Sequence, residues 1–158
     1  MTVIGGGMHT GEFIDEGNIS SDYVHRIFIN YEIRSSLSDD ESIWIETESK
    51  IPINVELDKF RKLIKFQSFV GVNRKLNDTH KFCFVNELNG HSQIKFFIKS
   101  GLLFGDYWIV YKGGVAEFQV IHAYKTFYRL FMETIRSAYK VDGVLDKCLN
   151  SGIIMNYQ

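Results

Sequence analysis

The chain has 158 residues, of which 45% are hydrophobic and 15% aromatic, and its formal charge at pH 7 is −1. This length and composition predict one globular domain with its own core. The chain lacks the clusters of Lys and Arg that a surface for nucleic acid needs. No apolar run approaches the roughly 20 residues that span a bilayer. The N-terminus also lacks the pattern of a signal peptide. We therefore expect no nucleic acid or membrane partner and a cytoplasmic location.

The first 18 residues are rich in glycine and show little periodicity, which predicts a flexible leader. The first helix is expected to begin at Ser20 or Ser21, because either side chain can cap the first turn. It should fade by Arg34, before a polar turn over 35–42. Spacing of three and four residues gives the helix one apolar face, made of Tyr23, Val24, Ile27, Phe28 and Tyr31.

Three segments then alternate between apolar and polar residues, which predicts strands. Their ranges are Ser42–Glu48, Ile51–Leu57 and Arg61–Val72. In the first, Ile43 and Ile45 share a face opposite to Trp44. Short turns between the segments favour antiparallel pairing.

A second helix is expected to follow a polar break, with Asn77 or Asp78 as its cap. It should end near Asn89-Gly90, because glycine accepts the left-handed backbone that ends many helices. Its predicted apolar stripe contains Phe82, Val85 and Leu88, and Cys83 is expected to be a small buried hydrophobe. Two further strands, Gln93–Lys99 and Leu102–Tyr111, then meet at Ser100-Gly101.

The longest predicted helix covers Val115–Tyr139. Its main apolar stripe is Val120, Tyr124, Phe127, Phe131, Ile135 and Ala138. Further apolar residues widen this stripe: Phe118, Ile121, Tyr128 and Met132. A helix that is apolar on more than one side is buried between layers or contacts another subunit. Residues 143–158 are expected to form a C-terminal tail with a short helix.

The sequence thus predicts an α+β fold of one domain, over residues 19–142, in the order α-β-β-β-α-β-β-α with an antiparallel sheet packed by helices. Four segments characterise its second half: Phe84–Asn89, Lys95–Ile98, Leu102–Phe104 and Gly113-Gly114-Val115. In these segments and in element order, the chain resembles the YbjN family of bacterial proteins, which are described as sensory transduction regulators. The resemblance covers about Ser20 to Asp142. It implies a fold like that of type III secretion chaperones and a regulatory or chaperone-like role.

Residues with catalytic or metal-binding chemistry do not form a recognisable pattern. None of the five histidines pairs with another at the i, i+4 spacing of a helical metal site. Cys83 and Cys148 are 65 positions apart, and Gly-x-Ser-x-Gly is absent. We therefore expect no metal, no cofactor and no enzymatic activity.

The residues that we single out are polar groups in the second helix and aromatic groups in the later elements. Asn86 and Asn89, three positions apart, can bind backbone groups at the helix end or in the neighbouring hairpin. The candidate protein-binding surface consists of aromatic and flexible apolar residues typical of interfaces: Tyr107, Trp108, Tyr124, Tyr128 and Met132.

Two functions follow from these features. The first is a non-enzymatic module that binds a protein partner, with a chaperone-like or regulatory role; a homodimer is expected by the same surface argument. The second is a small-molecule sensor with a pocket between the sheet and the helices. An enclosed cavity with convergent polar groups would favour the sensor, and an exposed apolar surface would favour the protein-binding module.

Overall fold

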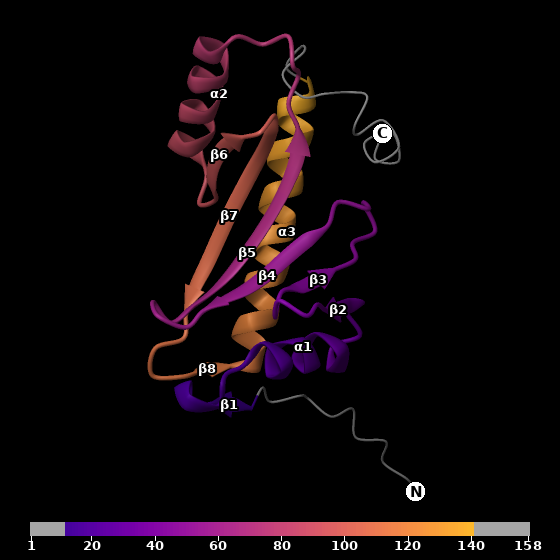
Figure 1. Cartoon of the computed structure of the whole chain (residues 1–158), viewed down its shortest axis with the longest axis vertical. Helices are drawn as coiled ribbons and strands as arrows, with labels where there is room; N and C mark the ends of the chain where they lie inside the picture. Colours follow the sequence, from indigo (N-terminus) through magenta and orange to yellow (C-terminus); the bar gives the residue numbers. More distant parts are fainter. Residues whose placement is uncertain (1–11, 141–158) are drawn as a thin grey trace, which may run out of the picture.

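The computed structural model describes residues 12–140, which fold into one α+β domain (Figure 1). The helices are the 3-10 turn η1 (Glu16–Asn18), α1 (Ser21–Asn30), α2 (Asp78–His91) and α3 (Glu117–Lys140). The strands are β1 (Phe13–Ile14), β2 (Ser35–Leu37), β3 (Ile43–Ile45), β4 (Ile53–Asp58), β5 (Leu63–Gly71), β6 (Lys95–Lys99), β7 (Leu102–Val110) and β8 (Val115–Ala116). The predicted order of the main helices and strands is confirmed.

Six of the strands form an antiparallel sheet in the order β2-β3-β4-β5-β7-β6. β7 lies between β5 and β6, so β6 forms one edge of the sheet and β2 the other. Figure 1 shows α3 running along one face of the sheet, behind β5 and β7, with α1 near its first turns. α2 lies at the opposite end of the molecule, beside β6. The other face of the sheet has no helix across it in this view.

Alternation along the strands decides which residues α3 covers. In β5 the buried side chains are Ile64, Phe66, Ser68 and Val70, at every second position as predicted. The stripe of α3 supplies Phe127 and Phe131, which lie against Phe66 and Phe96 with ring centroids 6.2 Å apart in each pair. The core is therefore a layer of aromatic and β-branched side chains between the sheet and α3.

Both predicted helix starts are present. The Ser20 hydroxyl accepts the amide of Tyr23 at 3.1 Å, which caps α1. The Asn77 side-chain oxygen accepts the amide of His80 at 2.8 Å, which caps α2. A polar side chain therefore fixes the start of each helix.

Three short strands were absent from the prediction. Ser35–Leu37 was expected to be part of a turn, but it forms β2 and pairs with β3. Phe13–Ile14 pairs with Val115–Ala116 in a two-stranded ribbon, so the end of the predicted leader belongs to the folded domain. The predicted C-terminal tail lies outside the described residues.

Two predictions for α2 are wrong. Phe82 is 72% exposed rather than part of a buried stripe, and Cys83 is exposed rather than buried. The reason is that α2 lies beside the edge strand β6 instead of between two layers, and none of its residues is buried. No helix in the described range is both long and apolar enough to cross a membrane.

Candidate functional site

The predicted protein-binding residues do not form one surface. Tyr107 lies on the α3 side of the sheet and stacks against Phe127 with ring centroids 6.4 Å apart, whereas Trp108 projects from the opposite face. Met132 is 5% exposed and belongs to the core, so its assignment to an exposed surface is wrong. The apolar band of α3 is wide because the helix packs on α1 as well as on β5 and β7.

The face of the sheet turned away from α3, here called the open face, carries the larger group of accessible aromatic residues. Its central row is Phe69, Phe104 and Phe97, which are partners across β5, β7 and β6. The ring centroids of Phe69 and Phe104 are 5.5 Å apart, and those of Phe104 and Phe97 are 5.2 Å apart with nearly parallel planes. These partly exposed rings form a continuous apolar strip across three strands.

A polar row lies next to the aromatic strip. The side-chain amide of Gln67 donates to Asp106 at 2.7 Å, and the Lys65 ammonium lies 3.6 Å from the same carboxylate. Asn54, the partner of Gln67 on β4, is only 8% exposed, and its amide oxygen has no hydrogen-bond partner among the described residues. The polar row thus adjoins a buried acceptor that is unpaired among the described residues.

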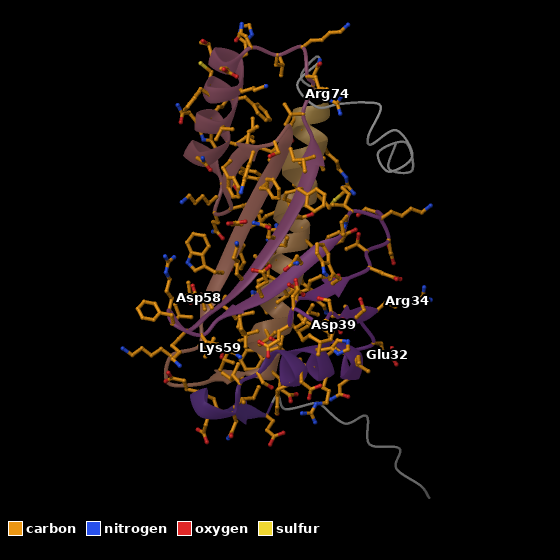
Figure 2. The ribbon with its side chains drawn as sticks, viewed as in Figure 1. Glu32, Arg34, Asp39, Asp58, Lys59 and Arg74 are labelled. Carbon is orange, nitrogen blue, oxygen red and sulfur yellow. The ribbon has the colours of Figure 1, made fainter. Side chains whose placement is uncertain are left out.

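Two tryptophans lie on the open face next to the polar row. Trp108 is 45% exposed and pairs across the strands with Lys65. Trp44 is 36% exposed and pairs with Asn54. A shallow hollow of about 330 Å³ adjoins Trp108 and is lined by Asp58, Arg61, Leu63, Lys65, Lys95 and Asp106. Figure 2 shows Asp58 at the β4–β5 turn, at one end of this face.

The aromatic strip continues onto α2. Phe97 and Ile98 line a hollow of about 320 Å³ together with Phe82 and Val85 of the helix. The helix is attached to β6 by Asn89, whose side chain binds both the amide and the carbonyl group of Phe96. Asn86 is exposed, and the structure gives it no comparable role. The exposed Phe82 is therefore part of the same apolar surface as the phenylalanine row.

Tyr124 and Tyr128 lie at the other edge of the molecule. Their rings stack with centroids 6.3 Å apart, and the edge of Phe28 contacts Tyr124 at a centroid distance of 5.9 Å. They line a cavity of about 620 Å³ with residues that precede β2 and follow β3: Glu32, Ile33, Arg34, Glu46, Thr47 and Glu48. Burial, with smaller effects from Tyr128 and Glu48, raises the pKa of Tyr124 to about 12. Tyr124 is therefore a neutral wall of this cavity at physiological pH.

Metal binding was not expected from the sequence. Among residues 12–140, no group of three or more His, Cys, Asp or Glu side chains is arranged to hold a metal ion. The features described above are aromatic surfaces, two shallow hollows and a larger cavity with a polar lining. Such surfaces bind other molecules through burial and hydrogen bonds.

Sequence reasoning placed Trp44 on the face opposite to Ile43 and Ile45, and the structure places Trp108 on the face opposite to Tyr107. Sequence reasoning did not show that the two tryptophans lie on the same face of the sheet, because this can be inferred only when the strand order is known. The pairing of β5 with β7 brings Phe69 next to Phe104. Alternation in each segment was the available signal, but it does not give the register between segments.

Comparison with known proteins supports the fold. No protein-family model matches the sequence, and no curated protein matches it either. The structure is similar to the crystal structure of YbjN from E. coli, with a TM-score of 0.67 and 12% identity, over 81% of this chain and 97% of that one. It is also similar to a chain in the structure of the HopA1–SchA chaperone–effector complex, with a TM-score of 0.50 and 9% identity, over 70% of this chain and 86% of that one. The protein therefore has a YbjN-like fold, which a chain of the chaperone–effector complex shares, as its sequence predicted.

Proposed function

We propose that this protein is a non-enzymatic protein-binding module with a chaperone-like or regulatory role, and that the open face is its binding surface. The observation that carries this proposal is the pair Trp44 and Trp108, both accessible on a sheet face that no described helix crosses (Figure 1). Tryptophan is enriched among the residues that dominate binding energy at interfaces. Burial of these two rings by a partner would remove apolar surface from water at two separate points.

The arrangement around the tryptophans is suited to a protein rather than to a small ligand. The phenylalanine strip, the polar row and Trp108 together extend across β5, β6 and β7. A broad apolar surface beside a row of hydrogen-bonding groups is typical of protein interfaces.

The structural neighbours agree with this class of function. One of them is a chain in a complex named for a chaperone and its effector. At 9% identity the similarity shows the fold alone. That this chain also binds a protein partner is therefore part of the proposal. The cytoplasmic location and the homodimer expected from the sequence belong to the same proposal.

The alternative function is a small-molecule sensor with its pocket between the sheet and the helices. The space between β5, β7 and α3 is instead filled by stacked rings of Phe66, Tyr107 and Phe127. A filled core offers no ligand pocket at this position. The protein-binding function is therefore the one that the geometry favours.

The experiment compares capture of partners by the unchanged protein and by the double variant Trp44→Ala and Trp108→Ala. The proposed function predicts that a stoichiometric partner is lost from the double variant, while circular dichroism shows the same fold. Phe118→Ala is the control, because Phe118 is 56% exposed on α3 and lies away from the open face. Equal capture by all three proteins would rule out the open face as the binding surface.

A further inference from the structure

We propose that the cavity lined by Tyr124, Tyr128 and the three glutamates Glu32, Glu46 and Glu48, here called the tyrosine cavity, binds the cationic end of a lysine or arginine side chain of a protein partner. This inference rests on the proposed protein-binding function for the source of the cation. It concerns a site at the edge of the sheet and not the open face.

The walls of the tyrosine cavity come from three parts of the chain. Tyr124 and Tyr128 are one turn apart on α3, and the rings of Phe28 and Tyr124 are in edge-on contact. The segments that contain Glu32 and Glu46 are joined by a backbone hydrogen bond, in which the amide of Glu46 donates to the carbonyl of Arg34 at 3.0 Å. Fixed rings and joined segments give a preformed cavity of about 620 Å³.

The charge around the cavity is negative. Three carboxylates and one guanidinium, from Arg34, line it, which gives a formal charge of −2. Within the described part of the chain, no salt bridge joins any of these four groups to a partner. Figure 2 shows Glu32 and Arg34 projecting at the edge of the molecule near β2, where an arriving ligand can meet them. Carboxylates that lack a cation favour a positively charged ligand.

The two tyrosine rings beside these carboxylates favour an organic cation over a metal ion. A compact metal ion needs several oxygen atoms converging on one point, and the described residues contain no such group. An ammonium or guanidinium group instead gains from the face of an aromatic ring and from hydrogen bonds to spread carboxylates. The aliphatic stem of lysine or arginine can also pack on the rings. The cavity therefore fits the end of a basic side chain.

The test uses two blocked tripeptides, Gly-Arg-Gly and Gly-citrulline-Gly, with NMR of the tyrosine ring protons as the readout. Citrulline keeps the shape of arginine and removes its charge. The arginine peptide should shift the rings of Tyr124 and Tyr128 and bind about tenfold more tightly than the citrulline peptide. The double variant Glu46→Gln and Glu48→Gln should weaken that binding by about fivefold or more, whereas Glu56→Gln, on the open face, should leave it unchanged.

Free spermidine separates the two sources of a cation. Binding of the peptide at least as tightly as spermidine supports a protein side chain, and tight binding of spermidine with no response to the peptide would overturn that source. No ring shift with either probe, or equal binding of the arginine and citrulline peptides, would overturn the cavity as a cation site. The peptides do not need the open face, so these results are independent of capture by the tryptophan variants.

Discussion

Asn89 on α2 binds the backbone of Phe96 on β6 at two points. Its side-chain amide donates to the Phe96 carbonyl oxygen at 3.0 Å, and its side-chain oxygen accepts the Phe96 amide at 2.7 Å. β6 is an edge strand, and these are backbone groups that β7 leaves unpaired. The asparagine thus completes the pairing of the edge and attaches α2 to the sheet.

Replacement of Asn89 by alanine should destabilise the protein by about 1–2 kcal/mol, because it removes two hydrogen bonds and leaves the groups of Phe96 unpaired. Urea unfolding measures the change. Asn86→Ala is the matched control, since Asn86 lies one turn earlier on the same helix and is exposed. An equal effect of both substitutions would contradict the role of Asn89.

We expect that any residue larger than glycine at position 105 destabilises the protein. A Cβ atom at this position of β7 would lie 2.8 Å from two ring atoms of Phe131 and 3.0 Å from a methyl group of Ile94. Because those neighbours are buried, Gly105→Ala should cost about 1–3 kcal/mol in the free energy of unfolding. Gly90→Ala is the control, with free space around it in α2 and an expected gain of up to about 1 kcal/mol. A neutral Gly105→Ala would show that α3 packs less closely on β7.

Substitutions at Gly114 and Gly113 test the packing of β1 on β8. Both have positive φ, but a Cβ on Gly114 would lie 2.7 Å from the carbonyl oxygen of Ile14, whereas Gly113 has free space. Gly113→Ala should therefore show only the conformational cost of about 1–2 kcal/mol, and Gly114→Ala should also separate β1 from β8. Hydrogen exchange at the Glu117 amide, which donates to the Glu12 carbonyl oxygen at 3.0 Å beside the ribbon, reports the separation. Equal exchange in both variants would contradict this contact.

Glu16 should make the ribbon region sensitive to acid. Its carboxylate accepts the amide of Gly113 at 3.0 Å and lies 3.5 Å from the Lys62 ammonium. The hydrogen bond from Gly113 and, more weakly, Lys62 hold the pKa of this carboxyl below its ordinary value. A lowered pKa in the folded state means that the stabilisation is present above the ordinary pKa and is lost as pH falls through the folded one.

NMR of the Gly113 amide during an acid titration measures this directly. The midpoint should lie below the ordinary value for glutamate, and Glu16→Gln should abolish the shift. A midpoint at or above the ordinary value would contradict the hydrogen bond as its cause. Glu56→Gln, at an exposed position on β4, should leave the midpoint unchanged.

The order of the main elements followed from local patterns in the sequence. Alternation in Leu63–Gly71 and the caps at Ser20 and Asn77 are decided by neighbouring residues, so they were readable without a structure. The short strand Ser35–Leu37 was missed because its polar sequence resembles a turn, and its pairing with β3 decides its state. Phe13–Ile14 was missed for the same reason, since its partner lies about a hundred residues later.

The candidate surface was predicted less well than the fold. Helical periodicity shows that Met132 is apolar but not whether sheet, helix or solvent faces it, and in the structure it belongs to the buried core. The exposure of Phe82 depends on the place of α2 beside an edge strand, which the sequence of α2 does not contain. The open face required the strand order that brings Trp44, Trp108 and the phenylalanine strip to one side.

The most direct test of the proposed binding surface is site-specific photo-crosslinking in cells. A benzoylphenylalanine placed at Trp108 or Trp44 lies on the open face, and one placed at Ile29, which is 52% exposed on α1, is the control. The proposed function predicts crosslinks to a distinct protein from the two tryptophan positions and none from Ile29. Crosslinks to the same protein from Ile29 alone, or no crosslink from either tryptophan position, would contradict binding through the open face.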